Sequence, residues 1–165
     1  LLERRIVSSS FGKTFHATGW KIGYCRASSE LTKEFRKIHQ FVNFTVSTPF
    51  QMALADYLKW NVEFCDQLGL FYQAKRDYFC SLLSKSRFQV RPSQGTYFQL
   101  LDYSNISGEL DVTLSEEWTR KLGIASIPIS VFYKKQPASS QALLRFCFAK
   151  DDATLEKAGE ILCRI

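Results

Sequence analysis

The chain has 165 residues, of which 45% are hydrophobic and 23% charged, so it can bury one compact core or two incomplete ones and is not a disordered tail. No apolar run reaches the ~18 residues that a membrane-spanning helix needs. The formal net charge is +6, with eight Lys or Arg against three Asp or Glu in the first fifty residues. This charge fits a phosphorylated ligand, nucleic acid or a solvated helix face, but no basic run exceeds two residues and no nucleic-acid module signature is present, which argues against DNA binding.

The first forty residues predict two strands and a helix. Residues 5–9 are rich in β-forming side chains, and the polar turn Ser10-Phe-Gly-Lys13 follows them. Residues 20–26 alternate apolar and polar side chains, which indicates a second strand. Apolar residues then recur at helical spacing from 31 to 41, so a helix comes next.

Two further helices are predicted in the middle of the chain. Thr48-Pro-Phe-Gln51 is a helix start, because Thr48 can cap, Pro suits the first helical position and Gln51 can reach back to the N–H of the cap. After Asn61, apolar side chains share one stripe over six turns, at Phe64, Leu68, Phe71, Tyr78 and Leu82. A helix of this length is typical of one that bridges two lobes, so we place a lobe boundary near residue 60.

The last part of the chain predicts more strands than helices. Strands are expected over 87–91, 96–102 and 142–148. Helices are expected after a capping box at Thr113–Glu116, ending at Gly123, and from Asp151 to about Arg164. The pattern predicts a mixed α/β (α+β) fold, divided into 1–60 and 61–165.

Cysteine and histidine give little support to metal binding. The five cysteines are an odd number without a C-x-x-C pair, which argues against a zinc site and against a disulfide scaffold. Because they lie among Phe, Leu and Ile, we expect buried thiols in a reducing compartment, the cytoplasm. The only two histidines, His16 and His39, are 23 positions apart, so no metal centre is predicted.

Lys13 is the first candidate for chemistry, as an imine-forming amine on a turn after a strand. Only the neutral amine is nucleophilic, so such a lysine needs partial burial or a cationic neighbour. Lys21 lies eight residues on, a span of ~26 Å if extended, so both can serve one ligand only if segment 14–20 folds back, as Gly19 permits. Ser10 and Lys21 could then hold a phosphate beside the Lys13 amine. A surface lysine on a turn is the plain alternative.

The string Ser10-Phe-Gly-Lys-Thr-Phe-His-Ala-Thr-Gly-Trp-Lys-Ile-Gly-Tyr24 closely resembles the cofactor-lysine region of class I/II aminotransferases. These are fold-type I enzymes that depend on pyridoxal 5'-phosphate (PLP). The wording Gly-Lys-Thr-Phe-x-x-Thr-Gly-Trp-Lys is similar to that of the methionine and kynurenine–oxoglutarate aminotransferase branch. The resemblance continues through Lys37-Ile-His-Gln40, Ser47-Thr-Pro-Phe-Gln51, Gln94-Gly-Thr-Tyr-Phe98 and Leu144-Arg-Phe-Cys-Phe-Ala-Lys150.

The resemblance implies a role for each of five residues. Lys13 forms the Schiff base with PLP and shuttles a proton between the substrate Cα and the cofactor. Ser10 and Lys21 bind the PLP phosphate. Arg145 holds the substrate α-carboxylate through two hydrogen bonds, and its strongly apolar neighbours argue against a surface arginine on an edge strand. Phe44 approaches the active site of the other subunit, so the resemblance also implies a homodimer. The substrates implied are amino acids and 2-oxo acids.

Several family residues lie upstream of the cofactor lysine. They are the acid at the pyridine nitrogen, the aromatic that stacks on the ring, and the Asn and Tyr at the phenolic oxygen. Only twelve residues precede Lys13, and Glu3 is too close to match the acid. We therefore expect the C-terminal portion of an aminotransferase, with the end of the large PLP domain and most of the small domain. The hypothesis is that this piece alone does not transaminate.

Two alternatives belong to other classes. Ser10-x-x-Lys13 fits the Ser-x-x-Lys signature of penicillin-recognising acyl enzymes, and Tyr103-Ser-Asn105 resembles their second motif. That reading lacks a Lys-Thr-Gly strand, and Gly12 with Gly19 argues against the helix it requires. The other alternative is a non-catalytic folded fragment or degenerate module, which does not account for the intact set of Ser10, Lys13, Lys21 and Arg145.

Overall fold

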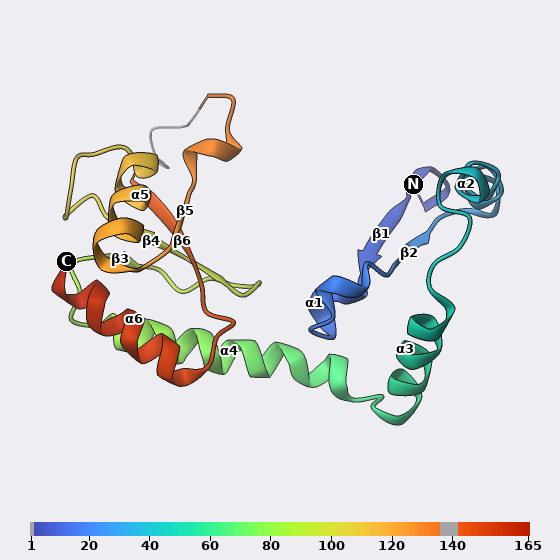
Figure 1. The fold of residues 1–165 in the computed structure, drawn as a ribbon, viewed down its shortest axis with the longest axis horizontal. Coiled ribbons are helices and arrows are strands. Elements are labelled where there is room, and N and C mark those ends of the chain that lie inside the picture. Colours follow the sequence, from blue (N-terminus) through green and yellow to red (C-terminus); the bar gives the residue numbers. More distant parts are fainter. Residues whose placement is uncertain (1, 136–141) are drawn as a thin grey trace. The chain divides into compact units, whose positions relative to one another are not determined.

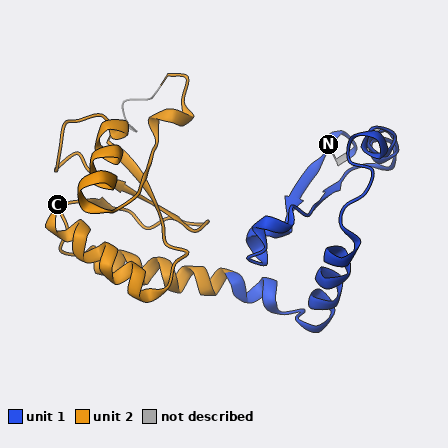
Figure 2. Ribbon diagram, in the orientation of Figure 1, with its two compact units in different colours: residues 1–68 blue, residues 69–165 orange. Residues whose placement is uncertain are grey.

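The computed structural model describes residues 2–135 and 142–165, and contacts divide the chain into two compact units (Figure 2). Unit 1 is Leu1–Leu68 and unit 2 is Gly69–Ile165. The boundary falls inside the long helix α4 (Phe64–Leu82), which contributes residues to both units. None of the described helices is long and apolar enough to cross a membrane.

Unit 1 combines a short β-hairpin-like pair with helices (Figure 1). Its elements are η1 (Leu2–Arg4), β1 (Val7–Ser10), α1 (Phe11–Thr14), η2 (Thr18–Trp20), β2 (Gly23–Arg26), α2 (Ser29–Val42), α3 (Thr48–Trp60) and the start of α4. Strands β1 and β2 are antiparallel, with Val7 opposite Arg26 and Ser10 opposite Gly23. The expected helix over 31–41 is confirmed as α2, which begins after Ser28, whose side chain accepts from the Leu31 N–H.

Three local predictions in unit 1 are wrong. The turn at 10–13 is instead the single-turn helix α1, and Trp20 belongs to η2 rather than to a strand. The capping box at α3 does not form, because Ser47 is the N-cap, without a side-chain bond, and Gln51 donates to the Val46 carbonyl. At these short segments, local hydrogen bonds between side chains and backbone decide the conformation, and the sequence pattern alone does not reveal them.

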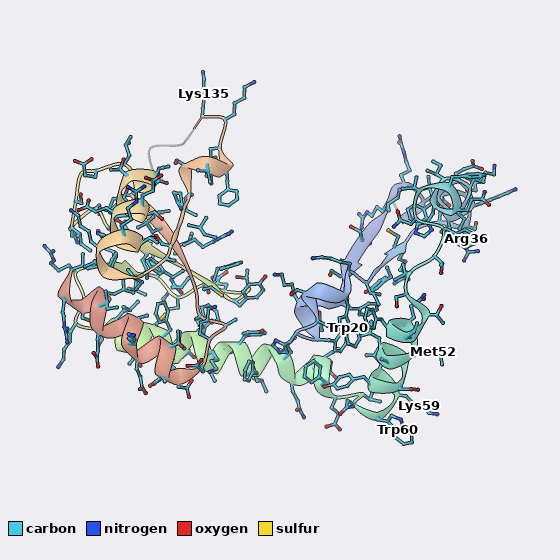
Figure 3. All side chains as sticks on the ribbon, in the orientation of Figure 1. Trp20, Arg36, Met52, Lys59, Trp60 and Lys135 are labelled. Atoms are coloured by element: carbon cyan, nitrogen blue, oxygen red, sulfur yellow. The ribbon has the colours of Figure 1, made fainter. Side chains whose placement is uncertain are left out.

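Unit 1 is held together mainly by aromatic contacts rather than by a closed core. Trp20, which is labelled in Figure 3, stacks on Phe50 of α3 with 4.6 Å between ring centroids, and the ring centroids of Phe15 and Phe64 lie 5.6 Å apart. Among its described apolar side chains only Ile22 and Leu54 are buried. Large apolar side chains are exposed on α2, on the loops and on α3, among them Ile38, Phe41, Val42, Phe44, Met52, Trp60 and Val62.

Unit 2 is an antiparallel sheet with helices packed on one face. Its elements are the rest of α4, β3 (Gln89–Val90), β4 (Phe98–Asp102), α5 (Asp111–Leu122), β5 (Ile127–Pro128), η3 (Ser130–Phe132), β6 (Leu143–Cys147) and α6 (Asp152–Arg164). The strand order is β3-β4-β6-β5, so β6 is an inner strand. The core draws on all three helices and on alternate positions of β4 and β6, and includes Phe79, Leu83, Leu101, Leu114, Trp118, Leu144, Phe146, Leu155 and Leu162.

Helices α4 and α6 lie side by side and touch at a glycine (Figure 1). A Cβ placed on Gly159 would lie 2.9 Å from the Leu82 Cβ, so only glycine allows this approach. Lys75 fixes the other end of the pair, because its Nζ donates to the Lys150 carbonyl at 2.8 Å and to an Asp152 carboxylate oxygen at 2.7 Å. Only 19% of the Lys75 side chain is exposed, so its ion pair is better protected from solvent than an ordinary surface pair.

The helices and strands predicted in unit 2 are present, but the first or last residues of several of them differ from the prediction. Helix α5 begins at Asp111, two residues before the predicted capping box, and ends as expected at Gly123, whose φ is 66°. The strand expected over 87–91 is reduced to Gln89–Val90, and β5 was not predicted.

The expectation of buried cysteines is wrong. Cys25 and Cys65 are exposed, whereas Cys80, Cys147 and Cys163 are partly buried, and all five are free thiols. Apolar neighbours in the sequence did not imply burial here, because much of the apolar surface of unit 1 is itself exposed.

Candidate functional site

Residues 10–23, here called the fold-back, bring Ser10, Lys13 and Lys21 into one local structure. The Phe11 N–H donates to the Ile22 carbonyl at 3.0 Å, continuing the β1–β2 pairing beyond Ser10. Inside the loop the Ala17 N–H donates to the Gly12 carbonyl at 2.9 Å. The return of segment 14–20 that a shared ligand requires is therefore present.

Ser10 caps the helix that carries Lys13. Its Oγ accepts from the Gly12 N–H at 3.1 Å and defines the first turn of α1. A hydroxyl that accepts in this way still has its own hydrogen to donate, so Ser10 can bind an anion without losing the cap. Gly12 is buried, and a Cβ there would lie 3.3 Å from Ser10 Oγ and 3.2 Å from Thr18 Cα.

The fold-back uses left-handed backbone at residues that are not glycine. His16 has φ 54° and Lys21 has φ 55°, a conformation that costs an L-residue free energy. Gly19, which we expected to permit the return, lies within it but has no positive φ. Lys21 is thus held in a strained conformation next to Ile22, whose side chain is buried.

The three candidate ligand-binding side chains of the fold-back are accessible to a ligand. Ser10, Lys13 and Lys21 are all exposed.

Phe44 lies in the loop between α2 and α3. Its side chain is 80% exposed and its φ is 61°, again left-handed. The Phe44 N–H donates to the His39 carbonyl at 3.0 Å, so the strained turn is anchored to the last turn of α2. An exposed aromatic ring on a fixed turn is suited to contact with another surface.

Arg145 belongs to unit 2 and lies on inner strand β6, not on an edge, opposite Leu100 of β4 and Ile127 of β5. Its neighbours Leu144 and Phe146 point into the core, so strand alternation places Arg145 on the opposite face of the sheet. Its Nε is buried and has no hydrogen-bond partner in the described part of the chain. An unpaired buried donor costs free energy, and a carboxylate would satisfy it.

Two aromatic rings face the Arg145 guanidinium. Its Cζ lies 4.2 Å from the ring centroid of Phe98 and 5.0 Å from that of Phe132. Cation–π contacts of this kind hold a guanidinium in place while its N–H edge stays able to bind. The ring centroid of Tyr72 lies 6.0 Å from that of Tyr97, and burial raises the pKa of Tyr72, with smaller contributions from Cys147 and Tyr97, so this phenol stays neutral.

Sequence reasoning missed the residues that support Arg145. Phe98 lay in a quoted motif without a role, and Phe132 and its contacts were not considered. The buried Asp111 and Ser130, which are joined by hydrogen bonds, are 19 positions apart. Asp111 lies just before the predicted capping box, but nothing in the sequence identified Ser130 as its partner.

The structure also bears on the acyl-enzyme alternative. The argument that Gly12 and Gly19 prevent a helix is wrong, since Ser10 does cap a turn of helix. Tyr103 of the supposed second motif is 1% exposed in the core of unit 2, and its hydroxyl donates to the Glu109 carbonyl at 3.0 Å. A buried tyrosine in this position cannot reach a substrate.

Known proteins place the chain in a family. The model of aminotransferase class I and II matches residues 2–162, and the chain therefore belongs to that family. It is 46% identical over 162 residues to a methionine aminotransferase of Escherichia coli strain K12, covering 98% of this chain and 42% of that protein. It is 35% identical to a kynurenine–oxoglutarate transaminase of Dictyostelium discoideum, covering 99% of this chain and 42% of that protein.

Solved structures agree with this assignment. An Escherichia coli structure reported with a methionine aminotransferase function matches at a TM-score of 0.94 and 45% identity, over 100% of this chain and 43% of that one. An N-succinyldiaminopimelate aminotransferase of Mycobacterium tuberculosis matches at a TM-score of 0.88 and 34% identity, over 99% and 42%. These matches confirm the expected mixed α/β fold as part of a fold-type I aminotransferase. The chain spans about 42% of the length of the curated relatives.

Proposed function

We propose that this chain is the C-terminal part of a PLP-dependent aminotransferase. Residues 1–60 are the end of the large PLP domain, and 61–165 are the interdomain helix and the small domain. The whole protein transfers an amino group between an L-amino acid and a 2-oxo acid. The observation that carries the proposal is the fold-back, which sets the family's lysine on a serine-capped turn and pairs the backbone of Phe11 with that of Ile22, next to Lys21.

The donor set of the fold-back fits a phosphate-bearing aldehyde. The Ser10 hydroxyl and the Lys21 ammonium supply a hydrogen bond and a positive charge for the phosphate, and buried Gly12 lets the backbone turn tightly beneath them. Lys13 would supply the amine that bonds the aldehyde carbon, whose oxygen leaves as water. When bound, PLP would supply an electron sink for the charge left after loss of a Cα proton. The Lys13 amine would accept that proton from Cα when it is not bonded to the cofactor.

Arg145 binds the substrate α-carboxylate. Its guanidinium can present two parallel N–H bonds, and its buried Nε is a donor without an acceptor among the residues that the structure describes. The rings of Phe98 and Phe132 exclude water from part of the guanidinium and so strengthen its charge interactions. Relatives named for methionine and kynurenine support a sulfur-containing, aromatic or kynurenine-like amino donor.

The proposal includes assembly and location. The full-length protein is a homodimer, and the exposed ring of Phe44 contacts the partner subunit near its active site. The five free thiols support a cytoplasmic location, because a reducing compartment keeps them unpaired.

Borohydride reduction with PLP, followed by peptide mapping, tests the assignment. A pyridoxyl adduct on Lys13 is expected in the wild-type chain and none at that site in Lys13→Ala, whereas Lys33→Ala on α2 should label like the wild type. Labelling spread evenly over surface lysines would contradict the role of Lys13. Turnover of methionine with a 2-oxo acid by the isolated chain would contradict the hypothesis that it lacks part of its site.

The exposure of Lys13 favours a second candidate, a folded module without catalytic activity. The two candidates differ in their spectra, because only a lysine-bound PLP gives a visible absorbance band that Lys13→Ala abolishes. A chain that binds no PLP at any concentration up to the millimolar range supports the non-catalytic module.

A further inference from the structure

Asp111 is a buried carboxylate at the start of α5. It is 3% exposed and accepts three hydrogen bonds, two of them from one residue. Its Oδ2 accepts from the Ser130 N–H at 2.7 Å, and its Oδ1 accepts from the Ser130 Oγ–H at 2.7 Å and from the Val112 N–H at 2.9 Å. We call the pair of bonds to Ser130 the Asp111–Ser130 bridge.

The bridge suits a carboxylate. The Ser130 N–H, the Ser130 hydroxyl and the Val112 N–H all donate to Asp111, and a carboxylate can accept from all three. An asparagine has one acceptor oxygen, so it would leave a backbone N–H without its acceptor or require the Ser130 hydroxyl to turn and accept. Charge-assisted bonds of this kind are shorter and stronger than neutral ones, which suits the 2.7 Å distances. No salt bridge to Asp111 occurs in the described part of the chain, so these donors alone compensate its burial.

The bridge fixes the single turn that carries Phe132. Ser130 begins η3, the Phe132 N–H donates to the Ile129 carbonyl at 3.1 Å, and the Tyr133 N–H donates to the Ser130 carbonyl at 3.0 Å. The Phe132 ring is 59% exposed, so packing holds it weakly, and its position depends on its backbone. That ring lies 5.0 Å from the Arg145 guanidinium carbon.

A second tie joins the same segment to α5 without involving Asp111. The Ser115 Oγ–H donates to the Ser126 carbonyl at 2.8 Å, and the Ser126 hydroxyl donates to Ser115 Oγ at 3.1 Å. This tie holds the segment before β5, whereas the Asp111–Ser130 bridge holds the turn after it. The two ties therefore allow a matched comparison.

We propose that Asp111 is a positioning residue for Arg145. Through Ser130 it holds the turn that keeps the Phe132 ring against the guanidinium, and so it sets the direction in which the Arg145 N–H edge points. Its consequence for carboxylate binding rests on the proposed function, but the positioning itself does not.

The test is NMR of the Arg145 Nε–Hε and Cδ–H signals, assigned by their loss in Arg145→Lys. A nearby ring shifts these protons, and Phe132→Leu removes the contribution of Phe132. We expect Asp111→Asn to move the signals in the same direction by at least half as much. Adding Phe132→Leu to Asp111→Asn should then give less than half its effect in the wild-type background.

Ser115→Ala is the control, since it loosens the same segment but keeps the bridge, and it should leave the Arg145 signals within a tenth of the Phe132→Leu shift. If Asp111→Asn fails to fold, Ser130→Ala removes only the Oγ bond and should give a smaller shift in the same direction. Unchanged signals in the bridge variants, or an equal shift in Ser115→Ala, would overturn the proposal. These readouts need neither PLP nor turnover, so they succeed or fail independently of the proposed function.

Discussion

Tyr103 is the side chain in unit 2 whose ionisation should affect stability most clearly. It is 1% exposed, and burial raises the pKa of Tyr103 to about 12, with smaller contributions from Asp111 and Asp102. Its hydroxyl donates to the Glu109 carbonyl at 3.0 Å. The folded state therefore favours the neutral phenol, which alone can donate this bond.

Replacing Tyr103 by Phe should flatten the loss of stability in alkali. In the wild type this residue's contribution is fully present below the unfolded pKa of 10.0 and is lost as pH rises to about 12. Ionisation of Tyr103 should therefore lower the free energy of unfolding by about 2 kcal/mol as the pH rises from the unfolded to the folded pKa. Urea unfolding at several pH values should show a constant cost of about 1 kcal/mol for Tyr103→Phe below pH 10 and a shallower alkaline slope. Parallel curves for the two proteins would contradict the assignment.

At the scale of elements, the β1–β2 pair depends on Gly23. Gly23 faces Ser10 across the pair, and a Cβ there would lie 2.4 Å from the Ser9 carbonyl oxygen. Gly23→Ala should open the pair at a cost of about 1–3 kcal/mol and reduce both amide protection in β1 and PLP labelling of Lys13. Gly19→Ala, which meets nothing within 4 Å, should leave both unchanged. Equal behaviour of the two variants would show that this contact does not support the fold-back.

Two helical glycines should respond to alanine with opposite signs. Gly159→Ala gains about 1 kcal/mol of helix propensity but forces α6 away from the Leu82 Cβ, at a cost of about 1–3 kcal/mol, so we expect a net loss. Gly69→Ala on α4 meets nothing within 4 Å and should gain about 0.5–1 kcal/mol. The melting temperatures of both variants measure these changes in stability. A higher Tm for Gly159→Ala would show that α4 and α6 can move apart at little cost.

The elements that the sequence predicted well are those with many periodic apolar positions. Helices α2 and α4 were identified because their repeats extend over several turns, and α6 was identified from its capping residue Asp151. The elements it missed are short: α1 is one turn and β5 has two residues, so tertiary pairing with Ile22 or Arg145 decides them. Helix α5 begins at Asp111 and not at the box around Thr113, because the Asp111 carboxylate serves Ser130 as well as its own helix.

The candidate site divides in the same way. Ser10, Lys13 and Lys21 were found from their order in a motif, and the local fold-back needed only short-range pairing. The rings facing Arg145 come from segments 98 and 132, far from each other in the sequence, so no local pattern announces them. Their support from Asp111 is a contact between distant residues, which one sequence does not reveal.

At the scale of the whole molecule, the buried core is unevenly distributed. The main hydrophobic cluster lies entirely in unit 2, between Phe79 and Leu162. In unit 1 the described part buries few apolar side chains and exposes many, so less hydrophobic free energy opposes its local opening.

Hydrogen exchange followed by mass spectrometry should therefore separate the units. Amides of β1 and β2 should exchange at least tenfold faster than those of β4 and β6, although both pairs are antiparallel and hydrogen bonded.

A dye that binds apolar surface should also bind the folded chain and lose signal as Phe41 and Trp60 are replaced by polar residues. Equal protection in both strand pairs would contradict this description.

The left-handed backbone at Lys21 lowers the thermal stability of the chain but keeps a positive charge at the proposed phosphate site. With lysine at this position, the folded chain is about 1 kcal/mol less stable toward unfolding than it would be with glycine. Directed evolution toward higher melting temperature alone should therefore enrich glycine or asparagine at this codon, and the survivors should lose the cation that we propose binds the phosphate. Selection that alternates heat with cofactor capture should restore the lysine.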